Sequence, residues 1–174
     1  MKKLLLMLAL VASINVNAQD DWKNEIAVSY GAGSNTDLIS SFFKGMFTGK
    51  QTDYVGPIAL EYFYQTDCGL KIGAVAAYGQ CKWDDGNDSK SKFYTIMPAV
   101  KYNWLRKNHF SMYSKLAAGI TIDKDDSTIK EKSTTTFNFQ ASFVGLEFGG
   151  AFRGFVEAGL GEQGVFIAGL RYKF

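Results

Sequence analysis

Eight charged residues stand singly in segments that are otherwise apolar or built from small residues. They are the residues of this chain whose types and spacing could do chemistry: Glu25, Glu61, Lys71, Lys101, Lys115, Glu147, Glu157 and Arg171. Carboxylates could form an acid–base pair, a row of charges could line an ion path, and opposite charges could neutralise one another. The choice between these roles depends on the elements that position the charges.

Those elements are predicted to be β-strands, because apolar residues recur at every second position. The clearest segment, Phe93 to Trp104, has aromatic and branched side chains on one face and Lys101 among smaller or polar residues on the other. Eight such segments are predicted: Trp22–Gly33, Tyr54–Gln65, 69–80, Phe93–Trp104, Phe110–Ile120, Thr134–Phe148, Phe155–Leu160 and Val165–Phe174. The alternation slips in the sixth, which predicts a bulge near Val144-Gly145. Pro98 lies mid-strand, where we expect a local bulge or an unpaired carbonyl facing the lumen.

The predicted connections alternate in length. Those after the second, fourth and sixth strands are tight turns, whereas Ser34–Asp53, Cys81–Ser91 and Asp123–Ser133 are long. Short turns at one end and long loops at the other are typical of bacterial outer-membrane barrels. A soluble barrel would show water a row rich in Lys and Glu, but here the non-apolar row is mostly Gly, Ala, Ser and Thr. We therefore expect an eight-stranded antiparallel up-and-down transmembrane β-barrel whose inward charges pair in a narrow lumen.

The N-terminus has the form of a secretory signal peptide. A basic start is followed by the apolar run Leu4 to Val11 and by small residues at Val16-Asn17-Ala18. We expect residues 1–18 to be cleaved and residues 19–174 to form the barrel domain in the outer membrane, with both termini in the periplasm. The whole chain has 19 Lys and Arg against 17 Asp and Glu, and loss of Lys2 and Lys3 leaves 17 of each. A neutral chain has no general attraction for nucleic acid.

Cysteines and histidine offer little chemistry. Cys68 and Cys81 flank a predicted strand, about 40 Å apart at about 3.3 Å per residue, whereas a disulfide needs Cα atoms about 4.4–6.8 Å apart. We expect two unpaired thiols at opposite ends of the barrel. The only histidine, His109, falls in a short turn on the periplasmic side, so no Ser–His pair can be built near the outer leaflet. Neither a metal site nor a cofactor is predicted.

With the signal peptide and eight strands in place, two motifs carry a family resemblance. They are Ile96-Met97-Pro98-Ala99-Val100-Lys101-Tyr102-Asn103-Trp104 and Ala168-Gly169-Leu170-Arg171-Tyr172-Lys173-Phe174. The chain resembles the small OmpA/OmpX-type outer-membrane β-barrel family, in the form common among Bacteroidetes. The resemblance implies that the last strand is a signal for the barrel-assembly machinery, carried by Gly169, Leu170, Tyr172 and Phe174. It also implies contact with outer-membrane lipid.

The first long connection has helical rather than strand periodicity. Between Leu38 and Phe47, one half of a helical wheel is apolar, and it consists of Leu38, Ile39, Phe42, Phe43, Met46 and Phe47. A short amphipathic helix is therefore predicted in the first extracellular loop. It could fold over the barrel mouth, or it could be a docking face for another outer-membrane protein or lipoprotein.

The expected function is non-enzymatic. We predict a barrel with a salt-bridged, non-conducting lumen that acts in envelope structure or in surface interaction through its long loops. The alternatives are an accessory subunit of a larger outer-membrane complex, a narrow channel, and a lipid-modifying enzyme.

Overall fold

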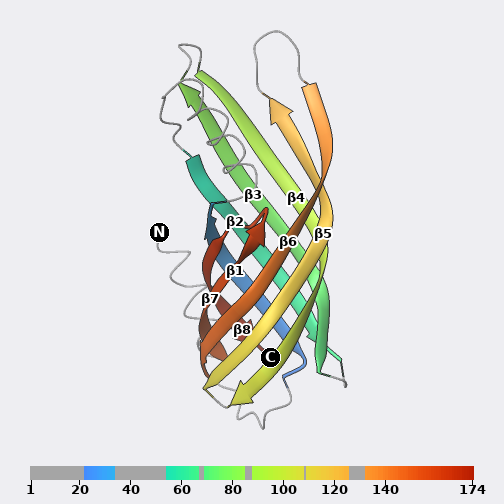
Figure 1. The fold of residues 1–174 in the computed structure, drawn as a ribbon, viewed down its shortest axis with the longest axis vertical. Coiled ribbons are helices and arrows are strands. Elements are labelled where there is room, and N and C mark those ends of the chain that lie inside the picture. The colour runs from blue at the N-terminus through green and yellow to red at the C-terminus, as the bar shows by residue number, and fades with distance from the viewer. Residues whose placement is uncertain (1–21, 34–53, 67–68, 85–87, 108, 126–131) are drawn as a thin grey trace.

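The computed structural model describes residues 22–33, 54–66, 69–84, 88–107, 109–125 and 132–174. These residues form eight strands: β1 (Asn24–Ala32), β2 (Tyr54–Gln65), β3 (Leu70–Asp84), β4 (Asp88–Lys107), β5 (Phe110–Asp125), β6 (Lys132–Gly149), β7 (Phe152–Gly161) and β8 (Phe166–Lys173). Each strand pairs antiparallel with the next, and β8 returns to pair with β1, so the barrel is closed. The predicted fold class is confirmed (Figure 1).

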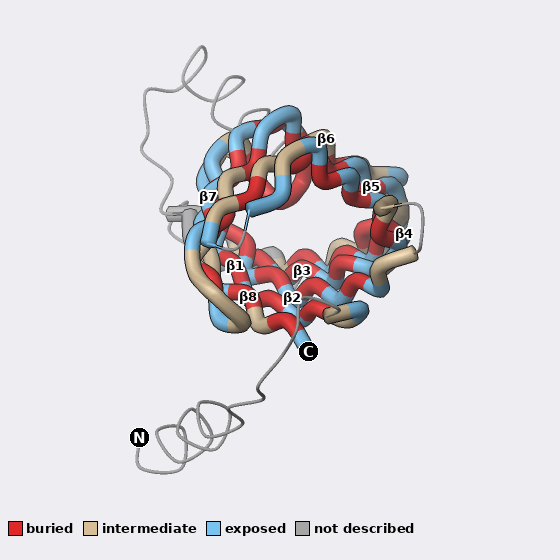
Figure 2. The backbone as a smooth tube through the Cα atoms, turned by 90° about the horizontal axis from the view of Figure 1, so that it is seen from below, coloured by how far each residue is buried: buried red, intermediate tan, exposed pale blue. Residues whose placement is uncertain are grey.

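Alternation along each strand separates an inward row from an outward row. On β1 the burial pattern alternates strictly from Glu25, which is buried, to Ala32, which is exposed. Figure 2 shows the same alternation around the closed ring of strands. Large apolar side chains on the outer face are about half exposed, as at Val28 (54%), Ile96 (57%) and Leu116 (58%). A continuous apolar surface of this kind requires a lipid environment.

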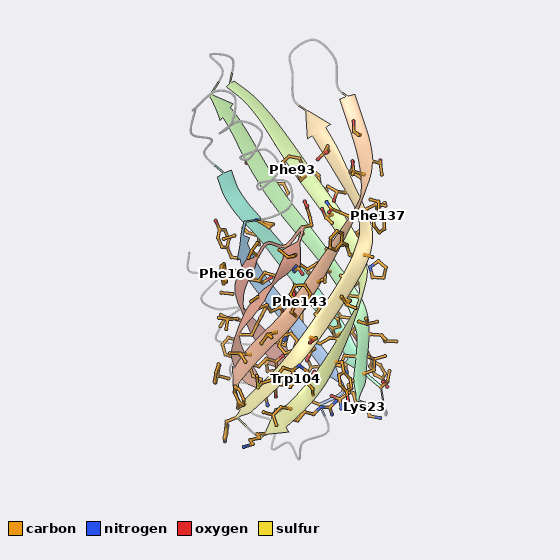
Figure 3. All side chains as sticks on the ribbon, viewed as in Figure 1. Lys23, Phe93, Trp104, Phe137, Phe143 and Phe166 are labelled. Atoms are coloured by element: carbon orange, nitrogen blue, oxygen red, sulfur yellow. The ribbon has the colours of Figure 1, made fainter. Side chains whose placement is uncertain are left out.

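Aromatic residues lie toward both ends of this outer face. Trp104 is near the end that carries the short turns and the C-terminus, and Phe137 is nearer the opposite end (Figure 3). We call the first of these the short-turn end. Such aromatic girdles mark the two interfaces of a transmembrane barrel.

Three bulges adjust the register of the barrel. The bulge predicted in the sixth strand is confirmed at Phe143-Val144, where both side chains face outward and Glu147 is brought back inside. A second bulge lies between Val55 and Ile58 on β2, the stretch that contains Pro57. Since proline has no N–H to donate, a bulge is a position that tolerates it. The third interrupts the β4–β5 pairing between Asn103 and Leu105.

Pro98 is accommodated without a bulge, so that part of the prediction is wrong. The β4–β5 register is the same at Ile96–Ile120 and at Ala99–Ala117, on either side of Pro98. On its other edge Pro98 pairs with Ala74 of β3. The ladder therefore passes the proline in register.

Two of the predicted long loops are shorter than expected. Strands β3 and β4 stay paired from Cys81–Ser91 out to Asp84–Asp88, so the expected loop Cys81–Ser91 is largely a hairpin extension. Likewise β5 continues to Asp125 and β6 begins at Lys132, inside the expected loop Asp123–Ser133. As a result, β3 to β6 extend well beyond the other four strands at the end opposite the short turns (Figure 1). Sequence alone underestimated these strands because residues outside the bilayer need no apolar row.

Some predictions lie outside the described residues. They include the signal peptide, the loop helix with its face Leu38, Ile39, Phe42, Phe43, Met46 and Phe47, and the thiol of Cys68. The described residues contain no helix that is long and apolar enough to cross a membrane.

Candidate functional site: a charge network in the barrel lumen

Arg171 lies at the centre of the charge network in the lumen. It lies on β8 opposite Ala27 of β1 and Arg153 of β7, and its side chain is fully buried. Its guanidinium group hydrogen-bonds Glu147 and, at 2.8 Å, Glu61. It also forms longer ion pairs with the two carboxylates that lie farther away: Glu25 at 3.6 Å and Glu157 at 3.9 Å. All four inward glutamates predicted from the sequence therefore converge on one arginine.

Two lysines bridge the glutamates in pairs. Lys101 donates to Glu25 at 2.7 Å and to Glu147 at 2.5 Å. Lys115 lies 2.6 Å from Glu61 and 2.8 Å from Glu157. Both lysines are fully buried. Because a buried charge without a partner is strongly destabilising, removing one member of these pairs should lower the stability of the barrel.

Three further cations extend the network toward the short-turn end. Lys71 donates to Glu25 at 2.5 Å, and Lys173 donates to Glu147 at 2.7 Å. The guanidinium group of Arg153 lies 4.0 Å from Glu147. Lys173 was not among the predicted lumen charges, although it lies in the same alternating row as Arg171.

Neutral groups complete the hydrogen bonding of the carboxylates. Glu157 accepts hydrogen bonds at 2.6 Å from the hydroxyls of both Tyr113 and Ser142. The Gln163 side chain donates to Glu61 at 2.9 Å, and its backbone N–H donates at 2.8 Å to the side-chain oxygen of Gln140. The hydrogen bonds to Glu157 and Glu61 are charge-assisted, and such bonds are stronger than neutral ones.

Gln163 is another participant in the network that was not predicted from the sequence. It lies in the β7–β8 connection, which reads as an ordinary turn, yet Glu162 and Gln163 are 4% and 1% exposed. The connection folds into the barrel mouth instead of projecting from it. A turn sequence carries no periodicity that reveals such a position.

Aromatic rings and small apolar residues fill the rest of the lumen. The Lys101 ammonium lies 4.1 Å from the centroid of the Tyr113 ring, and the Arg171 guanidinium lies 4.2 Å from the centroid of Phe155. Cation–π contacts in a desolvated site add to the ion pairs. An apolar cluster that includes Phe63, Val75 and Met97 occupies another part of the interior.

The residues predicted to form the assembly signal lie on and just after β8. Leu170 and Phe174 are about half exposed on the outer face, and the rings of Tyr172 and Phe174 stack with centroids 5.8 Å apart. Gly169 pairs with Phe155, whose ring would lie 2.7 Å from any added Cβ. Gly169 therefore makes room for a ring that contacts Arg171.

Fold and interior together define an eight-stranded transmembrane β-barrel whose lumen is filled with paired charges. No protein-family model matches the chain, and no curated protein matches it. Several solved structures, however, match the chain. The N-terminal β-barrel domain of OprF from Pseudomonas aeruginosa aligns with a TM-score of 0.51 and 11% identity, over 90% of this chain and 100% of that one. Neisserial surface protein A aligns with a TM-score of 0.51 and 11% identity, over 87% of this chain and 95% of that one.

Ail, the attachment invasion locus protein of Yersinia pestis, aligns with a TM-score of 0.46 and 17% identity, over 87% of this chain and 98% of that one. At identities this low, the likeness to the OprF domain and Neisserial surface protein A concerns the fold alone. That fold is the eight-stranded barrel of outer-membrane proteins.

Proposed function

We propose that this protein is a non-enzymatic barrel of the outer membrane, which acts in envelope structure or surface interaction through the part that extends beyond the bilayer. The observation that carries the proposal is the division of the barrel into two regions. The membrane-level interior is a closed charge network, whereas β3 to β6 project beyond β7, β8 and β1 at the end opposite the short turns (Figure 1). Export by the signal peptide and insertion by the barrel-assembly machinery would place the termini in the periplasm and this projection outside the cell.

The interior supports a structural rather than a catalytic role. Each of the four central glutamates contacts at least two cations, so the carboxylates are committed to ion pairs. Among the described residues, no group of three or more His, Cys, Asp and Glu side chains could hold a metal ion. Arg171, Lys101 and Lys115 are fully buried, which leaves water little access across the centre of the lumen. These features favour a plug over an ion path.

A shortened hairpin tests the role of the projection. Replacing residues 82–90 with a two-residue Asn-Gly turn leaves Cys81 and Ser91 as the last pair of the β3–β4 hairpin, which such a turn connects well. We expect the variant to insert and to keep heat-modifiable migration on gels. Any partner that co-elutes in stoichiometric amount with the native protein from mild detergent should be lost.

A second variant, Phe42→Ser with Phe43→Ser, tests whether the predicted loop helix contributes to the same surface. Ser40→Ala with Ser41→Ala, on the opposite half of the helical wheel, is its control. If the native protein has no stoichiometric partner, or if both the shortened hairpin and the double Ser variant retain it, the interaction role is wrong.

A further inference from the structure

A small cationic cavity lies inside the short-turn end of the barrel, on the side of the charge network away from the projecting strands. Its volume is about 80 Å³. Five positively charged side chains line it: Lys71, Arg106, Lys107, Arg153 and Lys173. Among the described residues that line it, none is acidic. Figure 3 shows side-chain nitrogen atoms gathered at this end, near Lys23.

Two of the three lysines that line the cavity, Lys71 and Lys173, are held by carboxylates outside it. Lys71 and Lys173 are 3% and 7% exposed, and their carboxylate partners Glu25 and Glu147 do not line the cavity. An ammonium group has three N–H donors. Each lysine donates one hydrogen bond to its glutamate, so donors remain for a ligand.

Both arginines donate hydrogen bonds to neutral groups. Arg153 donates to the Gly150 carbonyl at 2.8 Å and to the Ser111 hydroxyl at 2.9 Å, with Glu147 farther off at 4.0 Å. Arg106 donates to the Gly69 carbonyl at 2.7 Å. Carbonyl and hydroxyl oxygens orient a guanidinium group without cancelling its charge. The cavity therefore keeps a positive excess.

Asn103 is an independent indication that the cavity binds a ligand. It lines the cavity, is 8% exposed, and its side-chain oxygen has no hydrogen-bond partner. Buried polar atoms are nearly always paired, so an orphan needs a reason. The oxygen and the NH2 group of the Asn103 side-chain amide have nearly the same shape. A rotation of this amide by 180° would direct its N–H donors, and not its oxygen, toward a bound anion.

We propose that this cavity binds the phosphate group of a ligand that enters from the short-turn side. A phosphate group carries one negative charge as a diester and close to two as a monoester, and its several acceptor oxygens suit a group of arginines and lysines better than the two oxygens of a carboxylate do. The volume suits one such group and not an attached sugar or acyl chain. Trp22 also lines the cavity. In the orientation that the proposed function gives the barrel, this end faces the inner-leaflet headgroups. The phosphate could therefore come from a soluble compound or from a phospholipid.

The test uses the full barrel in maltoside micelles, which contain no phosphate, with inorganic phosphate as the probe. The indole N–H signal of Trp22, assigned by comparison with Trp22→Phe, reports the cavity by NMR. We expect a saturable shift with phosphate and none with chloride at the same ionic strength. Arg106→Gln with Lys107→Gln should weaken the affinity by about tenfold or more, as expected when charge-assisted hydrogen bonds are lost. Lys92→Gln, near the other end of β4, is the matched control and should change nothing.

Anionic phospholipid nanodiscs separate the two sources. If the headgroup is the ligand, the Trp22 signal takes its bound position there before phosphate is added, and added phosphate does not move it. If the ligand is soluble, phosphate shifts the signal in nanodiscs as it does in micelles. Equal shifts with chloride, no saturable shift, or unchanged affinity in the double variant would overturn the site. Lys107→Gln alone, at an exposed turn position, keeps the test available if the double variant does not fold.

Discussion

Arg171→Met is expected to destabilise the folded barrel by about 3–5 kcal/mol, the range found when one partner of a buried ion pair is removed. The variant keeps most of the side-chain volume but removes the one group that contacts Glu25, Glu61, Glu147 and Glu157. Lys115 is then left with two carboxylates, Glu61 and Glu157. The measurement is reversible urea unfolding of the protein in lipid vesicles, followed by tryptophan fluorescence.

Two further variants separate charge from packing. Arg106→Met removes an exposed arginine at the short-turn end and should cost less than about 1 kcal/mol. Arg171→Met with Glu61→Gln leaves Lys115 with one carboxylate, so it should be more stable than Arg171→Met alone. If the double variant is no more stable, the loss in Arg171→Met does not come from carboxylates left without enough cations, and the view of the lumen as a charge network is wrong.

Gly145→Val is expected to cost about 2–4 kcal/mol, from overpacking and from loss of a hydrogen bond to a charged group. Gly145 pairs with Tyr113 across the sheet, and an added Cβ would lie 2.3 Å from the phenol ring. The ring has nowhere to move, because Tyr113 is fully buried, contacts Lys101, and donates to Glu157.

The matched control is Gly154→Val on the adjacent strand β7. An added Cβ at Gly154 meets nothing within 4 Å, and Gly154 lies between Phe148 and Leu170 on the outer face. Its effect should stay within about 0.5 kcal/mol in the same unfolding experiment. Equal losses at the two positions would show that strand propensity, and not the close approach to Tyr113, governs Gly145.

Much of the fold could be predicted from alternation alone. The inward and outward rows of side chains on each strand follow from the period of two. A bulge near Phe143-Val144 is expected because without it Glu147 would face lipid. The extent of β3 and β4 could not be predicted. Their outer ends, around Lys82 and Lys90, contain Ser, Lys and Asp without an apolar row, although the backbones still pair.

It was harder to predict which lumen side chains contact one another than to predict which side chains face the lumen. Sequence identified Arg171 as inward, and strand adjacency alone would favour Glu25 or Glu157 as its partner, because these lie on neighbouring strands. The structure instead directs its hydrogen bonds to Glu147 and Glu61, on β6 and β2. Strand tilt and register decide which side chains meet across the lumen, and neither is encoded in the spacing of residues along one strand.

The central claim is that ion pairs close the lumen, and current through planar lipid bilayers tests it most directly. The purified barrel, with insertion verified by heat-modifiable migration and with a porin reconstituted in parallel as a positive control, should give no stepwise current at any applied voltage that the bilayer tolerates. A stable, ion-selective single-channel current from the native protein would contradict the claim.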